Sequence, residues 1–243
     1  ENYKESMSIA EKLISSNKNN KIYWEIYAKS KLKLGLDCED SFEVFLQFFV
    51  EQENPDKAKE KLSEIKQIFP DFKSFDFFCG QIQYKNREFE ESYKSFLKAT
   101  KNKIKLEYSY LYLGIIERLI NSDYKKSIKF LKKSINIKPT SHANNELGVI
   151  YMNSHEHIDY NKAGDYFIKS LALNENFYNA LINLGNLQIK LNKNEDALLT
   201  FLKPFLNNDN KYVISADNPI FEKFSNYIAF SINLIAAEKK ELT

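Results

Sequence analysis

Two histidines flank a glutamate at His155, Glu156 and His157, and these are residue types that bind zinc in proteins. Imidazoles two residues apart could share one ion, and Asp159 could add an oxygen. The sequence has no HExxH spacing, however, and no third ligand at a helical interval from the pair. We therefore interpret the segment as a solvated loop, and we expect neither a metal site nor a bound cofactor.

The other nucleophiles and acids have ordinary structural interpretations. Cys38 and Cys79 lie in separate segments without a CxxC partner, which is typical of reduced thiols in a protein core. Glu90 and Glu91 are adjacent, so on a helix their carboxylates point about 100° apart and do not converge on a substrate. The sequence contains no P-loop, GxGxxG or GxSxG motif. These observations predict a protein that is not an enzyme.

The densest charge in the chain is basic, because six lysines fall within residues 125–138. An acidic partner or nucleic acid could bind such a face, but no arginine lies among the lysines and no aromatic cluster accompanies them. Lysine outnumbers arginine 33 to 2 in the whole chain, a bias that genome composition explains, and the net charge is only +2. A solvated face is the favoured interpretation, and no nucleic-acid partner is expected.

Composition favours a helical protein with a large core. Six glycines and five prolines among 243 residues argue against a turn-dense β-sandwich, while nineteen phenylalanines and fifteen tyrosines argue against disorder. The longest uncharged stretch, residues 224–237, is shorter than the roughly 20 residues of a membrane helix. We expect no integral membrane segment. A cytoplasmic location is favoured, and because the sequence starts at Glu1, export after removal of a leader stays open.

A pattern of glycine, small and apolar residues recurs along the sequence and indicates repeated pairs of helices. Four helical stretches contain a glycine after an apolar residue, and the glycines are 34, 34 and 37 residues apart: Gly80, Gly114, Gly148 and Gly185. Downstream of each glycine a small residue precedes a large apolar one by four positions: Ser92/Phe96, Ser127/Leu131, Ala163/Phe167 and Ala197/Phe201. One period before Gly80 the chain has Leu46, so we expect the first helix pair to be splayed.

This pattern resembles the tetratricopeptide repeat (TPR) family, in five consecutive units over residues 39–207. The resemblance implies an all-α fold, a right-handed superhelix (α-solenoid) of antiparallel helix hairpins with about twelve helices. Residues 1–38 would form a repeat-like N-terminal hairpin from helices over 2–16 and 21–35. Residues 208–243 would supply a capping or incipient-repeat helix over 218–241. Pro204 should end the second helix of the fifth unit early.

In this family the first helix of each unit lines a concave surface that binds partner proteins. The resemblance therefore implies a non-catalytic adaptor or scaffold with a protein or peptide partner. We predict the partner-binding residues by mapping the inward-facing positions of these first helices. They are Phe77, Gln81, Tyr84, Tyr108, Leu111, Ile115, Arg118, Asn145, Val149, Met152, Asn179, Ile182, Asn186 and Ile189, and His142 and Asn183 lie on the same faces.

The predicted groove is apolar and bordered by amides, which suits an amphipathic helix or an extended hydrophobic segment. The best-known subfamily clamps acidic C-terminal tails with cationic residues, but here the equivalent positions hold Phe77, Leu111 and Ile115, and only Arg118 is cationic. A carboxylate clamp is therefore not expected. Packing against the neighbouring unit is the alternative interpretation for each predicted groove residue.

Two other functions stay open. Residues 218–241 are apolar on more than one side, so the chain could be a structural subunit that docks or self-associates through this helix and its convex face. Alternatively, the chain could be a regulatory TPR module of a multidomain enzyme such as a glycosyltransferase.

Overall fold

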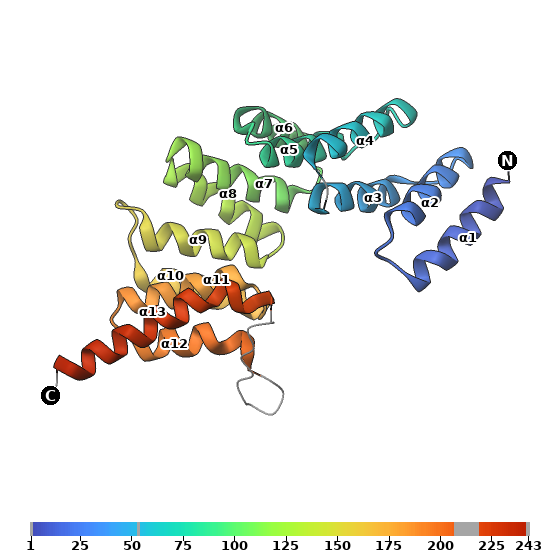
Figure 1. Ribbon diagram of the computed structural model, residues 1–243. Helices are drawn as coiled ribbons and strands as arrows, with labels where there is room; N and C mark the ends of the chain where they lie inside the picture. The colour runs from blue at the N-terminus through green and yellow to red at the C-terminus, as the bar shows by residue number, and fades with distance from the viewer. Residues whose placement is uncertain (1, 53, 207–218, 242–243) are drawn as a thin grey trace. The chain divides into compact units, whose positions relative to one another are not determined.

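The computed structural model describes residues 2–52, 54–206 and 219–241, and all of the elements in these ranges are helical (Figure 1). The predicted all-α class is confirmed, with thirteen α-helices in the described residues against the twelve expected. They are α1 (Tyr3–Ser16), α2 (Lys21–Lys33), α3 (Glu39–Gln52), α4 (Pro55–Ile68), α5 (Phe75–Lys85), α6 (Phe89–Lys101), α7 (Leu106–Ile116), α8 (Tyr124–Ile137), α9 (Ser141–Asn153), α10 (Tyr160–Leu173), α11 (Tyr178–Lys190), α12 (Asn194–Leu202) and α13 (Pro219–Glu241), with a π-helical turn η1 (Glu117–Asn121) and a 3₁₀ turn η2 (Lys203–Phe205).

The chain divides into two compact units, unit 1 (Glu1–Ile116) and unit 2 (Glu117–Thr243). Unit 1 holds α1 to α7, and unit 2 holds η1 to α13. The three-part division predicted from the sequence, at residues 38 and 207, stays a prediction.

Helix boundaries follow local capping chemistry. The Asn54 side chain accepts a hydrogen bond from the Asp56 amide at 2.9 Å, and Pro55 occupies the first position of α4. Asp123 and Asp159 cap α8 and α10 in the same way. Pro204 lies in η2, directly after α12 ends at Leu202, as predicted. The predicted cap Asn218 lies outside the described residues.

In unit 1, consecutive helices pack side by side (Figure 1). In the α5–α6 hairpin, Gly80 faces a ring of the neighbouring helix. A Cβ placed on Gly80 would lie 2.9 Å from the ring of Phe96, which is fully buried. The Ser92 hydroxyl donates to the Gly80 carbonyl at 2.8 Å, and the Phe96 ring stacks on Tyr112 with centroids 4.6 Å apart. The small residues of the repeat therefore bring the helix axes together, as their spacing predicts.

The preceding pair, α3 and α4, is in contact over less of its length. Leu46 occupies the position of the glycine and is fully buried, and Leu62 replaces the aromatic residue on α4. A leucine side chain here prevents as close an approach as a glycine allows, and the reduced contact between α3 and α4 is consistent with the predicted splay.

Two acidic residues of α3 accept hydrogen bonds from the residues that directly precede α5. The Glu39 carboxylate accepts hydrogen bonds from the amides of Lys73, at 3.3 Å, and Ser74, at 2.9 Å. Glu43 accepts a hydrogen bond from the Ser74 hydroxyl and forms an ion pair with Lys105 at 2.6 Å. These contacts place anions at the N-terminus of α5, where the helix dipole favours them.

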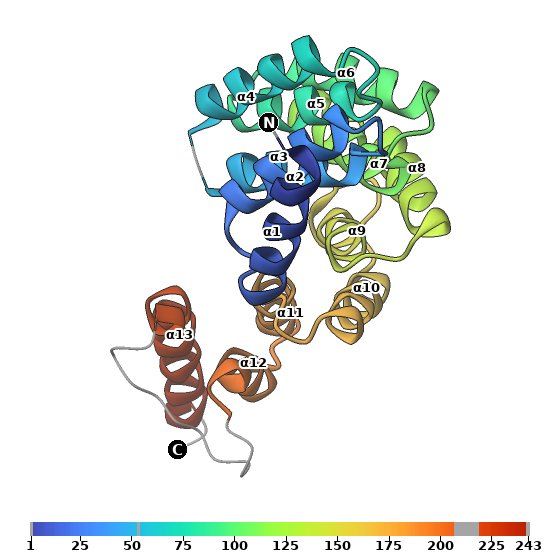
Figure 2. The ribbon, with the colours of Figure 1, turned by 90° about the vertical axis from the view of Figure 1, so that its right-hand side faces the viewer.

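Unit 2 repeats the hairpin with tighter crossings. A Cβ on Gly148 would lie 2.4 Å from the Phe167 ring, and one on Gly185 would lie 2.3 Å from the Phe201 ring. The long helix α13 lies alongside α12 (Figure 2) and contributes Phe224 to the core around Phe201. One face of α13 is therefore committed to the interior of unit 2.

Candidate functional site

The predicted site residues of unit 1 form an aromatic cluster on α5 and α7. Phe77 is buried, with its ring centroid 5.9 Å from that of Phe96 and 6.5 Å from that of Tyr108. Tyr84 packs edge-on against Tyr112, with centroids 5.2 Å apart. Tyr108 is 37% exposed and Tyr84 is half-buried, so the tyrosines reach the surface while Phe77 belongs to the core.

Gln81 is a buried polar residue at the same helix face. Its Nε2 donates to the Tyr112 hydroxyl at 3.4 Å, and its Oε1 is buried without a hydrogen-bond partner among the described atoms. Burial raises the pKa of Tyr112 above its usual value, and the bond to Gln81 opposes that rise. Leu111 is also buried and Ile115 is half-buried. Gln81 and Leu111 therefore offer a partner almost no surface.

Arg118, the single cation of the predicted site, is engaged within unit 2. Its Nη2 and Nε bind one oxygen of Glu146, at 2.6 and 3.1 Å, and both side chains are about four-fifths buried. This paired guanidinium has little charge left for a partner carboxylate, so the carboxylate clamp is again not supported.

An amide pair joins the first helices of unit 2. Asn183 on α11 donates through Nδ2 to Oδ1 of Asn145 on α9, at 2.9 Å. Asn145 is buried, as is Met152 further along α9. The predicted Asn row is thus partly used to bind one helix to the next.

Replacing Asn183 with alanine is expected to destabilise the protein by about 1–3 kcal/mol, because Oδ1 of buried Asn145 would lose its donor. Urea unfolding followed by circular dichroism measures the change. Asn179 provides the control, because it is exposed and its bond to Lys223 is long, at 3.2 Å. A loss in Asn179→Ala as large as that in Asn183→Ala would refute the importance of the amide pair.

The remaining polar and apolar residues of these helices share one face. Gly148 and Gly185 are 37 residues apart, and the same separation relates Val149 to Asn186. Val149 and Asn186 are half-exposed, and Asn186 forms no side-chain hydrogen bond with a described residue. Ile182 and Ile189 are half-buried, since each also packs on the core beneath α11.

The same face continues onto α13, which sequence reasoning did not assign to the site. Lys223 donates to Asn179 at 3.2 Å across a separation of 44 residues. That separation takes Asn186 to Phe230, which is 52% exposed, and takes Gly185 to Ala229. The Ile228-Ala229 dipeptide, in place of Leu-Gly, was the available signal. We call His142, Val149, Asn179, Ile182, Asn186 and Phe230 the first-helix surface of unit 2.

His142 lies at the edge of this surface. Its ring lies 4.5 Å from that of Phe177, and burial lowers the pKa of the imidazole, with a partial opposing effect from Glu146. The neutral ring is therefore favoured, so His142 adds an amphipathic group and no fixed charge.

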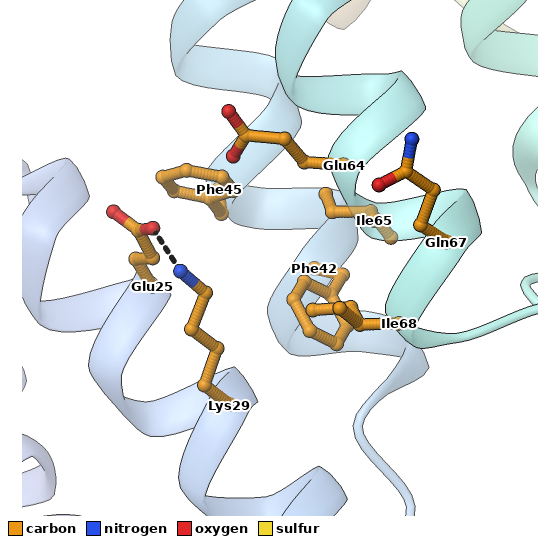
Figure 3. A pocket seen from close by; sticks show the side chains of 8 residues that line it. All are labelled: Glu25, Lys29, Phe42, Phe45, Glu64, Ile65, Gln67 and Ile68. Carbon is orange, nitrogen blue, oxygen red and sulfur yellow. Dashed lines mark hydrogen bonds and ion pairs between the residues drawn. The ribbon is translucent and has the colours of Figure 1, made fainter.

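Unit 1 contains a pocket of about 180 Å³ where α2, α3 and α4 meet (Figure 3). Phe42, Phe45 and Ile65 line it as buried apolar residues, and the Glu25–Lys29 ion pair, at 2.6 Å, lies at one side. Ile68 also lines the pocket and is 46% exposed, so the pocket is open to solvent on that side.

The histidines, cysteines and carboxylates of the described residues form no cluster that could hold a metal ion. Within the residues that the structure describes, no helix has the length and apolarity to cross a membrane. His157 Nδ1 instead lies 3.3 Å from the Ser154 hydroxyl in the turn after α9. Cys38 and Cys79 are free thiols, and burial raises the pKa of Cys79 to about 11.

Known proteins resemble the chain in fold. No family model and no curated protein sequence matches it. Yeast Tom70 matches with a TM-score of 0.59 at 12% identity, over 98% of this chain and 59% of that chain. Cut9, from the APC/C hetero-tetramer Cut9–Hcn1, matches with a TM-score of 0.59 at 14% identity, over 98% and 47%. TTC0263, a thermophilic TPR protein of Thermus thermophilus, matches with a TM-score of 0.60 at 14% identity, over 83% and 99%. The fold is that of the tetratricopeptide repeat proteins.

The TPR fold confirms the helical repeat that the glycine spacing predicted. The chain spans less than two thirds of the length of the Tom70 and Cut9 chains that it matches. At these identities the likeness extends to the fold and not to the residues of any binding site.

Proposed function

We propose that the protein is a non-catalytic scaffold that binds a segment of a partner protein on the first-helix surface of unit 2. The observation that carries the proposal is the side-chain set of that surface. Val149, Ile182 and Phe230 are apolar and only partly covered, while the amides Asn179 and Asn186 lie between them. Such a set can bury a partner's apolar side chains and bond its backbone.

The energetics are sufficient for a specific complex. Each Leu- or Phe-sized side chain that the partner buries would contribute about 1.5–3 kcal/mol before ordering costs. Several such anchors and one hydrogen-bonded amide would leave a net binding free energy of roughly 8 kcal/mol after those costs. That value corresponds to a micromolar dissociation constant. The helices that carry the surface pack on buried Phe167 and Phe201, which would lower the ordering cost of binding.

The fold neighbours are consistent with this proposal. Cut9 was crystallised in a hetero-tetramer with Hcn1, so one protein of this fold binds another protein. The residues that would do so in unit 2 are those of the first-helix surface, and unit 1 would present Tyr84, Tyr108 and Ile115 as a separate candidate surface.

The test replaces one residue at the centre of the surface. Asn186→Arg introduces a long charged side chain on α11, and Asn161→Arg makes the same change on the exposed side of α10. With each purified variant as bait in native lysate, we expect a partner that is retained by the parent and by Asn161→Arg but reduced at least tenfold by Asn186→Arg. Equal retention by both variants would refute the proposed surface.

A second candidate is a structural subunit that self-associates through α13. Phe230 and Ile232 are both about half exposed and flank the buried face of α13 on opposite sides. Light scattering of the parent and of Ile232→Asp tests this role. A dimer that becomes a monomer in the variant would favour it, and a monomeric parent would exclude it.

A further inference from the structure

Helix α8 presents a concentrated positive charge. Its fourteen residues include five lysines, at positions 125, 126, 129, 132 and 133, and no carboxylate. Lys126 pairs with Asp123 at 3.1 Å, and Lys133 lies 5.9 Å above the ring of Phe130. None of Lys125, Lys129 and Lys132 pairs with a carboxylate among the described residues. These three exposed cations therefore form no ion pair within the described residues, although the charge of Lys125 helps to lower the pKa of Asp123.

The other second helices provide an internal control for the lysine bias of the chain. Helix α4 has four lysines and three carboxylates, and α6 has three lysines and two carboxylates. Helix α10 has two lysines and one carboxylate, and α12 has two carboxylates and no lysine. The same compositional bias acts on every one of these helices, so it does not explain why α8 alone among them is free of acid.

The charge is confined to one side of α8. Ser127, Leu131 and Ser134 are buried and form the inner face. Lys125, Lys129 and Lys132 are exposed on the opposite face, with spacings of four and three residues, and so form one stripe along the helix. We call these three residues the α8 stripe.

We propose that the α8 stripe binds an acidic segment of a partner protein in helical form. A facing helix with carboxylates at the same four- and three-residue spacings would match each lysine in turn. This surface is separate from the first-helix surface, because it lies on a second helix and uses charge instead of apolar contact. The protein would then have two independent docking sites.

The chemistry of the stripe favours a protein over nucleic acid or lipid. Lysine supplies point charges that attract carboxylates and phosphates alike, but the nearby Phe130 is half-buried with Lys133 5.9 Å from its ring, so it offers little open surface for base stacking. The apolar face of α8 is already buried in the protein and cannot enter a bilayer.

The experiment uses two alanine-based helical peptides of equal composition, one with four glutamates on one face at four- and three-residue spacings and one with the glutamates distributed around the helix. Their binding to the full chain is measured by fluorescence anisotropy at 50 and 300 mM salt. We expect the one-faced peptide to bind at least tenfold more tightly than the distributed one at 50 mM salt, and to weaken strongly at 300 mM. Phosphatidylserine vesicles and double-stranded DNA are titrated in parallel.

Two charge-reversal variants locate the site. Lys125→Glu with Lys129→Glu changes the stripe, and Lys94→Glu with Lys98→Glu makes the same change at the same spacing on the exposed side of α6. Only the α8 variant should lose the one-faced peptide, by tenfold or more, with helical content unchanged. Equal binding of both peptides, tighter binding of vesicles or DNA, equal loss in both variants, or no binding to any probe as expected of a merely solvated face, would each overturn the proposal.

Discussion

Gly148→Ala is expected to destabilise the protein by about 1–2 kcal/mol, although alanine is the better helix former. The added Cβ would lie 2.4 Å from Cε1 of Phe167. That ring is fully buried and is packed among Met152, Ala163 and Leu187, so moving it would displace these neighbours. Overpacking of this kind costs about 1–3 kcal/mol and occasionally more, which outweighs the helix-propensity gain of about 1 kcal/mol.

Gly164 supplies a matched control one helix away. Its added Cβ would meet only Leu187 Cδ2 at 3.6 Å, an ordinary contact, so Gly164→Ala should stabilise by about 0.4–1 kcal/mol. Urea unfolding by circular dichroism compares the two. Combining Gly148→Ala with Phe167→Leu should recover part of the loss, because a leucine stands at this position in the preceding repeat, at Leu131. If Gly148→Ala proves neutral, the close approach of α9 and α10 at this glycine is wrong.

Phe96→Ala is expected to have the largest effect in unit 1, a loss of about 3–5 kcal/mol. The ring is fully buried, fills the space above Gly80 and stacks on Tyr112. Its removal would leave a cavity where α5, α6 and α7 meet. Urea unfolding followed by both circular dichroism and Trp24 fluorescence measures the loss, since the single tryptophan lies on α2 of the same unit.

The same truncation at an exposed phenylalanine provides the comparison. Phe230 is 52% exposed on α13, and Phe230→Ala should change the free energy of unfolding by less than about 0.5 kcal/mol. If Phe96→Ala costs no more than Phe230→Ala, then the repeat's aromatic residue is not what joins α5 to α6.

The sequence was sufficient for the repeat because each unit must solve the same packing problem. Two helices that cross this closely need a glycine on one helix and an aromatic ring on the other. Because each unit has the same need, these residues recur in the sequence at a regular spacing. The Gly80/Phe96, Gly148/Phe167 and Gly185/Phe201 contacts are all found where that period predicts them. The exception, Leu46, was also predictable from its size.

The candidate site was harder to predict because inward-facing positions serve two purposes. Phe77, Gln81, Leu111, Asn145 and Met152 were predicted to contact a partner, yet they are buried against neighbouring helices or joined to them by hydrogen bonds. A helical position defines a direction and not the amount of surface left after the next helix has packed. Phe230, which belongs to the proposed surface, was not predicted for a different reason, because α13 follows at a separation of 44 residues instead of 34 to 37.

The central claim, that the first helices of unit 2 receive a partner protein, is tested most directly by site-specific photo-crosslinking. A photoreactive phenylalanine analogue is placed at Asn186 on the first-helix surface or at Asn161 on the exposed side of α10, and each protein is irradiated in native lysate. We predict a discrete crosslinked partner from position 186 and none from position 161. A crosslink from position 161 alone, or none from either position, would contradict the claim.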